Sequence, residues 1–232
     1  MSDSSAAPTS ETETLGYTLW AVFRRDRQLP APIGDLTAAV AEVEASGVAV
    51  RGFYDVSGPR ADADLMVWLH GAAGAGTGPE VLQAALRTLR RTEALSSLEP
   101  VWNAMGVHRD AEFTANHLPA FMRGKDPEAW LTVYPFVRSY DWYILPDEDR
   151  RRMLADHGRK GAEYRQVLAN TVASFALGDY EWILALEAPE LVDLVDLMRH
   201  LRQTEARRHV REEVPFFTGR RIGLDEIAEV LA

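Results

Sequence analysis

The chain of 232 residues contains no cysteine. This absence excludes disulfide bonds, thiolate zinc sites, iron–sulfur clusters and any cofactor ligated by a thiolate. No apolar run approaches the roughly 18–20 residues that a membrane-spanning helix needs. Basic residues are few, since 25 Lys and Arg stand against 35 Asp and Glu and the net charge is -10. This negative net charge argues against general nucleic-acid binding, although a few local arginines can still bind an anionic small molecule.

The first residues of the chain are polar and lack both a basic patch and an apolar segment. We therefore expect residues 1–14 to form a disordered tail rather than a secretory signal, and we expect a cytoplasmic protein. The remainder is rich in apolar and aromatic residues. Hydrophobic residues make up 47% of the chain, and its six tryptophans predict a large aromatic interior or interface.

The two halves of the chain show the same order of expected elements. In the first half we expect strands at residues 17–24, 48–56, 64–69 and 98–105, and helices at residues 36–45 and 80–94. In the second half we expect strands at residues 131–138, 171–177, 180–186 and 214–219, and helices from residue 147 to about 171 and at 190–209. The motif LRRTEA at residues 89–94 returns as LRQTEA at residues 201–206.

This doubled order predicts an α+β fold of two ferredoxin-like repeats, of the dimeric α/β-barrel type, with two facing antiparallel sheets. We assign residues 15–105 to the N-terminal repeat, 106–130 to an inter-repeat loop and 131–232 to the C-terminal repeat. Helices on the outer faces leave an interior between the sheets, where we expect room for a ligand. Long loops in compact domains are often functional, so the inter-repeat loop is a candidate lid.

The helix expected from residue 147 to about residue 171 has an unusual face. One stripe of this helix consists of Met153, His157, Gly161, Tyr164 and Leu168. Gly158 and Gly161 each cost roughly 0.5–1 kcal/mol relative to alanine inside a helix. They indicate that something flat and bulky, such as a haem bound through the His157 imidazole, approaches the helix. The alternative is a core histidine beside a helix packing notch.

Other candidate residues lie outside this helix. Alternation in the strand at 131–138 places Tyr134 and Arg138 on one face, which either lines a cavity for an anionic aromatic ligand or faces water. His117 in the inter-repeat loop is a candidate acid/base or a surface residue. Arg207 offers a guanidinium fork for a carboxylate or complements a helix dipole. We interpret acid pairs such as Glu212 and Glu213 as solvated charges.

Three segments, YPFVRSYDWYIL, RRMLADHGRKGAEY and LRQTEARRHVREEVPFFTGRR, closely resemble the chlorite dismutase-like superfamily. Within it they resemble the coproheme decarboxylases of the actinobacterial branch, and the resemblance covers the chain after its polar tail. It implies hydrogen peroxide-dependent oxidative decarboxylation of coproheme III (iron coproporphyrin III), which converts two propionates to vinyl groups and yields haem b. Coproheme is then both substrate and redox centre, and the reaction is the last step of coproporphyrin-dependent haem biosynthesis.

The resemblance also implies roles for individual residues. His157 matches the proximal iron ligand, Tyr134 the tyrosine that becomes a radical, and His117 the distal base that deprotonates peroxide. The remaining positions, where the family contacts the porphyrin or its propionates, are Arg138, Trp142 and Arg207.

By the same resemblance we expect a homopentamer and a transient contact with coproporphyrin ferrochelatase, and we expect no nucleic acid or membrane span. Two alternative functions stay open. A haem carrier or sensor would use the His157 pocket without turnover and would not need Tyr134. A chlorite dismutase or peroxidase-like enzyme would need a distal arginine, and the sequence shows no clear match to that motif.

Overall fold

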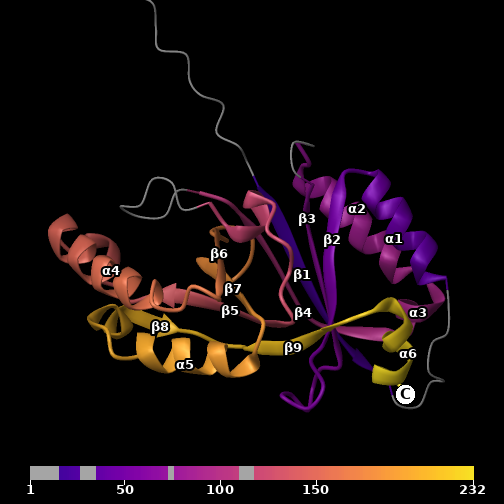
Figure 1. The fold of residues 1–232 in the computed structure, drawn as a ribbon. Helices are drawn as coiled ribbons and strands as arrows, with labels where there is room; N and C mark the ends of the chain where they lie inside the picture. The colour runs from indigo at the N-terminus through magenta and orange to yellow at the C-terminus, as the bar shows by residue number, and fades with distance from the viewer. Residues whose placement is uncertain (1–15, 27–34, 73–75, 110–117) are drawn as a thin grey trace, which may run out of the picture.

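Each half of the chain folds into a four-stranded antiparallel sheet with helices on its outer face (Figure 1). The computed structural model describes residues 16–26, 35–72, 76–109 and 118–232. The first half contains β1 (Tyr17–Arg25), α1 (Leu36–Ala45), β2 (Val48–Asp55), β3 (Leu65–Gly71), α2 (Pro79–Arg90), α3 (Glu93–Ser96) and β4 (Leu98–Val107). The second half contains β5 (Trp130–Arg138), α4 (Asp147–Gly161), β6 (Leu168–Ala173), β7 (Trp182–Ala188), α5 (Leu191–Leu201), β8 (Val210–Glu212), β9 (Phe217–Ile222) and α6 (Ile227–Val230). The 3-10 helices are η1 (Ala120–Arg123), η2 (Trp142–Ile144), η3 (Glu205–His209) and η4 (Leu224–Glu226).

The two sheets have the same strand order, which confirms the duplicated ferredoxin-like repeat. The order is β4-β1-β3-β2 in the first half and β9-β5-β7-β6 in the second. The sheets meet at two seams, β2 with β9 and β4 with β6, so the strands close into a continuous ring. In Figure 1, α1 and α2 lie at one end of the molecule and α4 and α5 at the other.

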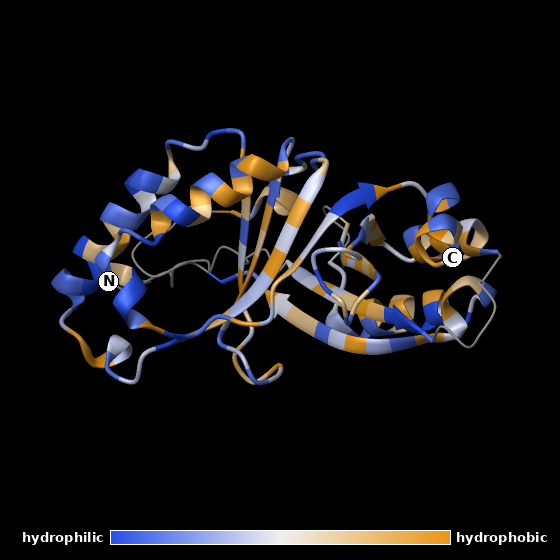
Figure 2. Ribbon diagram, turned by 90° about the horizontal axis from the view of Figure 1, so that it is seen from below, coloured by the Kyte–Doolittle hydropathy of each residue, from blue (hydrophilic) through white to orange (hydrophobic). Residues whose placement is uncertain are grey.

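The space between the two sheets is filled by side chains. Large residues of the first sheet, including Trp20, Tyr54 and Trp68, pack there against Leu131 and Ile183 of the second. The expectation of a ligand site between the sheets is therefore wrong, because bulky inward side chains occupy that interior. Two other cores lie on the outer faces, one beneath α1 and α2 and one beneath α5. Figure 2 shows hydrophobic residues recurring along the central strands and hydrophilic residues gathering on the outer helices.

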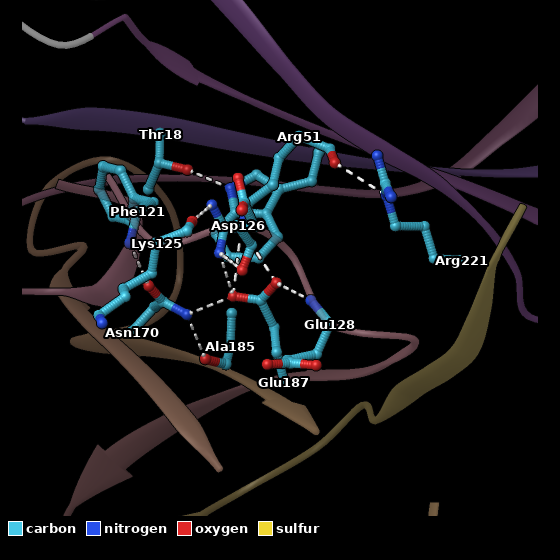
Figure 3. A network of polar contacts seen from close by, with 11 residues as sticks. Thr18, Arg51, Phe121, Lys125, Asp126, Glu128, Asn170, Ala185, Glu187 and Arg221 are labelled. Carbon is cyan, nitrogen blue, oxygen red and sulfur yellow. Dashed lines mark hydrogen bonds and ion pairs between the residues drawn. The ribbon is translucent and has the colours of Figure 1, made fainter. Parts of the chain in front are cut away.

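One buried ion pair joins the two halves inside this interior. Arg51 of β2 contacts Glu187 of β7, with 2.8 Å between Nη2 and Oε1, and their side chains are 4% and 0% exposed. Asn170 of β6 donates to Glu187 Oε1 at 2.9 Å and accepts from the Phe121 N–H at 2.9 Å (Figure 3). Arg51 also donates to the carbonyl of Lys125 at 3.0 Å. Residues 121–125, which belong to the segment between the halves, are therefore bonded to both sheets.

The expected helix from residue 147 to about residue 171 is too long. Helix α4 ends at Gly161, a turn follows, and β6 begins at Leu168. Six residues of β6 pair with β7, which satisfies their backbone groups and buries Val172. Sheet pairing thus overrides the helical spacing after the two glycines.

Other boundaries differ by smaller amounts. The expected helix at residues 190–209 is α5, which ends at Leu201, followed by the 3-10 helix η3. The expected helix at residues 80–94 is divided into α2 and α3. The strand expected at 214–219 is β9, which begins at Phe217, and β8 was not anticipated. The tail at residues 1–14 lies outside the described residues. Within the part of the chain that is described, every helix is too short or too polar to traverse a lipid bilayer.

Candidate active site

Tyr134 lies on the outer face of the second sheet, beneath α5. It is 4% exposed, pairs with Leu184 of β7, and packs in one core with Leu194 and Leu197 of α5. The alternation of β5 directs Leu131 and Val133 inward and Tyr134 outward, as the sequence predicts. The water-facing alternative for this strand face is wrong, because α5 covers it.

The phenol of Tyr134 sits in an apolar and polarisable environment. Its ring stacks on Phe216 with centroids 4.4 Å apart, and its hydroxyl lies 3.5 Å from the sulfur of Met198. Burial, reinforced by the negative charge of Glu213, raises the pKa of Tyr134 above its usual value. The side chain is therefore a neutral phenol at physiological pH, which must release both a proton and an electron to become a radical.

His157 is partly buried on the third turn of α4. Its Nδ1 atom is buried and has no hydrogen-bond partner within the described residues. Burial, followed by the positive charge of Arg138, lowers the pKa of His157. The imidazole is therefore neutral near pH 7 and can offer a nitrogen lone pair to a metal.

The two glycines beside His157 face open space. A Cβ atom added at Gly158 or at Gly161 would meet no atom within 4 Å, apart from the helix backbone and chain neighbours. The packing-notch alternative is wrong, because no neighbouring element of the described chain presses on α4 there. The unpartnered imidazole and the clear space beside it fit a flat group such as an iron porphyrin, with His157 as the residue that would hold the iron.

Arg138 and Trp142 connect the end of β5 to α4. The guanidinium of Arg138 lies 4.2 Å from the Trp142 ring centroid and 4.9 Å from that of Phe136. Trp142 is fully buried and packs with Met153 of α4, one turn before His157. Arg138 therefore brings a positive charge close to the imidazole, where a propionate of a porphyrin would need a cation.

Arg207 lies on η3 and shares a carboxylate with a second arginine. Its Nη1 donates to Glu213 Oε2 at 2.6 Å, and Nη1 of Arg202 donates to the same oxygen at 2.5 Å. The interpretation of Glu213 as a solvated charge is wrong, because its side chain is only 14% exposed and is held by both guanidiniums. All three charges are close enough to Tyr134 to affect its pKa.

A groove of about 330 Å³ opens between α5 and the outer face of the second sheet. Met198 and Phe216, the two residues that contact Tyr134, belong to its wall. The other lining residues are Thr132, Leu191, Leu194, Val195, Arg199, Arg202 and Thr218. This mostly apolar groove with arginines on one wall suits an amphipathic anion.

The structure thus gathers the predicted residues at one end of the second half, in two neighbouring groups. One group contains His157, Arg138 and Trp142, and the other contains Tyr134 and Arg207. His117 lies outside the described residues. Sequence reasoning did not select Met198, Phe216, Arg202 or Glu213 as site residues. Only the resemblance in LRQTEARRHVREEVPFFTGRR, which spans three of these four, could have drawn attention to them.

The fold and the site together define the class of this protein. It is a duplicated ferredoxin-like α+β protein whose candidate site lies between the second sheet and its helices, outside the closed ring of strands. Residues 31–222 match the chlorite dismutase family, and the chain belongs to that family.

Known proteins of similar sequence and structure agree with this assignment. The chain is 51% identical to the coproheme decarboxylase of Mycolicibacterium smegmatis over 223 residues, which cover 92% of this chain and 93% of that protein. A lysine variant of the chlorite dismutase from Candidatus Nitrospira defluvii has a similar structure, with a TM-score of 0.76 and 25% identity. That comparison covers 95% of this chain and 96% of the other.

Proposed function

We propose that this protein is a coproheme decarboxylase that uses hydrogen peroxide to convert coproheme III to haem b. The observation that carries the proposal is the 51% identity, over nearly the whole chain, to a coproheme decarboxylase. The site supports it with an unpartnered neutral imidazole, a buried phenol and arginines suited to carboxylates. Each propionate that becomes a vinyl group loses carbon dioxide and two hydrogens, and one peroxide is reduced to two waters.

Bound coproheme supplies the iron that activates peroxide and accepts its oxidising equivalents. His157 would hold that iron, and its lowered pKa favours the neutral ring, in which one of the two nitrogens carries no proton. Arg138 and Arg207 would bind propionates, and Trp142 would support the guanidinium of Arg138 against α4. His117 would accept the proton of peroxide as a general base.

Tyr134 would transfer the oxidising equivalent to the substrate. Its phenol would lose a proton and would give an electron to the oxidant formed from peroxide, which leaves a tyrosyl radical. The radical would take a hydrogen atom from a propionate and become a phenol again, and the substrate radical would then lose carbon dioxide and a second electron to form the vinyl group. The raised pKa of Tyr134 disfavours a resting phenolate, so proton and electron leave together. Stacking on Phe216 holds the ring in one orientation.

The direct test follows the mass of the product. Purified protein loaded with coproheme and titrated with hydrogen peroxide should lose two carboxyl groups stepwise as it forms haem b. Bleaching of coproheme without decarboxylation would contradict the proposal and favour a carrier or sensor. Oxygen release on addition of chlorite would instead favour a chlorite dismutase.

Tyr134→Phe should retain coproheme binding and lose turnover, because phenylalanine fills the same space and has no oxidisable hydroxyl. Binding is measured by absorbance titration and turnover by product mass. Tyr54→Phe is the matched control, since Tyr54 is a fully buried tyrosine of the strand interior whose hydroxyl has no partner in the described residues. Normal turnover by Tyr134→Phe would contradict the assigned role.

The proposal includes the assembly and the location implied by the resemblance. We expect a homopentamer in the cytoplasm that makes transient contact with coproporphyrin ferrochelatase. Light scattering of the purified protein tests the first point, and a mass corresponding to five chains is the expected result.

A further inference from the structure

Glu213 is shared between two arginines that come from different elements. Arg202 follows the end of α5, Arg207 lies on η3, and both donate to Oε2 of Glu213, at 2.5 and 2.6 Å. Two guanidiniums and one carboxylate leave a net charge of +1 in this cluster. An anion of a bound molecule would therefore be attracted to it.

The two guanidiniums have room for a second carboxylate. The side chains of Arg202 and Arg207 are each 39% exposed, whereas that of Glu213 is 14% exposed. A guanidinium carries five N–H donors, and one donor from each arginine is directed to Glu213. The remaining donors can receive an incoming carboxylate before Glu213 is released.

The cluster adjoins the groove beside Tyr134. Arg202 lines the groove together with Met198 and Phe216, which both contact the Tyr134 side chain. The charges of Arg202, Arg207 and Glu213 each affect the pKa of Tyr134. A carboxylate bound by these arginines would therefore lie close to the phenol.

We infer that Arg202, Arg207 and Glu213 form a carboxylate-exchange site, in which a propionate of the substrate takes the place of Glu213 between the two guanidiniums. The inference rests on the proposed function and extends it to two residues with no assigned role, Arg202 and Glu213. Before binding, Glu213 keeps the arginines positioned and neutralises half of their charge. When the propionate becomes a vinyl group the site loses its anion, and Glu213 returns to both arginines. Glu213 thus weakens substrate binding and favours product release.

If the two carboxylates exchange, replacing Glu213 and replacing Arg202 should have opposite effects on coproheme affinity. Glu213→Gln should bind coproheme about tenfold more tightly, because the competing negative charge is gone and the net charge becomes +2. Arg202→Gln should bind coproheme about tenfold more weakly. The affinity for haem b, which lacks the two propionates that react, should change less than threefold in both variants. The matched control is Arg208→Gln, which removes an exposed arginine of the same 3-10 helix.

The experiment is an absorbance titration of each variant with coproheme and, separately, with haem b. Melting temperatures of the ligand-free proteins check that the variants fold. The inference is overturned if Glu213→Gln binds coproheme more weakly, as a purely structural role would require, or if its ratio of coproheme to haem b affinity equals that of the wild type. Binding is measured without peroxide, so this outcome is distinguishable from a wild type that binds coproheme but does not decarboxylate it.

Discussion

At the scale of single residues, the environment of His157 decides its chemistry. A histidine whose pKa is lowered stays neutral to more acidic pH than an exposed one, and only the neutral ring can ligate a metal. The Nδ1 atom of His157 has no hydrogen-bond partner within the described residues, so no acceptor there holds a proton on Nδ1.

His157→Ala should lose the spectrum of an imidazole-ligated coproheme and bind coproheme at least about tenfold more weakly. The physical reason is the loss of the imidazole nitrogen that would hold the iron. Soret absorbance measures both effects, and added imidazole should restore the ligated spectrum. A variant with an unchanged Soret band would assign the iron ligand to another residue.

His70 gives the fold a dependence on pH that is separate from catalysis. Burial lowers the pKa of this β3 residue to about 4, and its ring lies 4.9 Å from the Phe121 ring. The unfolded chain takes up this proton near pH 6.5, whereas the folded chain takes it up only near pH 4. The contribution of the neutral His70 ring to the unfolding free energy is therefore fully present above pH 6.5. It is lost as the pH decreases towards 4, and this loss is at most about 3 kcal/mol.

Replacing His70 tests this dependence directly. His70→Gln should flatten the fall in unfolding free energy between pH 6.5 and 4, measured by urea denaturation at several pH values. His200→Gln, on the partly exposed face of α5, is the control for replacing a histidine. An equal slope in wild type and His70→Gln would show that other groups produce the acid sensitivity.

Candidate site residues could be predicted from the sequence where the local pattern around a single side chain indicates its role. Tyr134 and His157 were selected from their positions on a strand face and a helix stripe, and their burial agrees with those positions. Glu213 was missed because its partners, Arg202 and Arg207, come from two elements whose meeting depends on the path of the chain. Local spacing carries no information about such a meeting.

At the scale of elements, α4 shows where periodicity stops being reliable. Residues 147–161 follow the helical pattern, but Leu168, which continues the same spacing, lies in β6. By contrast, the helix expected at residues 36–45 is confirmed, since α1 has these bounds. The difference is that α1 ends where its pattern ends, whereas the segment after Gly161 pairs with β7.

Gly158→Ala should distinguish the effect of this glycine on the stability of α4 from its effect on ligand binding. The added methyl group meets no atom within 4 Å, so α4 should become more stable by about 0.5–1 kcal/mol. If a porphyrin approaches this face, the same methyl group should weaken coproheme binding. Thermal unfolding of the ligand-free protein and absorbance titration measure the two effects. Unchanged coproheme affinity would contradict the steric reason for the glycine, and Ala155→Ser, on an exposed position of α4, is the control.

At the scale of the whole molecule, duplication was the strongest signal in the sequence. The shared order of elements predicts two ferredoxin-like units, and both sheets have the strand order that this requires. The sequence did not predict that side chains fill the interior. The apolar residues on the inward faces of both sheets form an ordinary strand pattern, which does not indicate what they pack against. Their meeting depends on the seams β2–β9 and β4–β6, which join residues distant in sequence. The site was consequently expected between the sheets, whereas the predicted residues gather outside them.

The Arg51–Glu187 pair makes the two halves depend on one another. Removing one partner leaves a buried charge without its counter-ion, so Glu187→Gln should lower the unfolding free energy by about 3–5 kcal/mol. That loss is a large fraction of the unfolding free energy of a typical domain, which is roughly 5–15 kcal/mol. Arg51→Met should cost a similar amount, because among the described residues Glu187 then keeps Asn170 and the Glu128 N–H as its donors.

The double variant Arg51→Met/Glu187→Gln distinguishes a coupled pair from two independent residues. With both charges removed, the loss should be smaller than the sum of the two single losses, because no unpaired charge stays buried. Some loss should persist, since the carbonyl of Lys125 gives up a partner. Urea denaturation of all four proteins completes the cycle, and additive losses would contradict direct coupling. Arg24→Gln, which breaks an exposed pair with Glu99, is the control and should lower the unfolding free energy far less, because solvent screens exposed ion pairs.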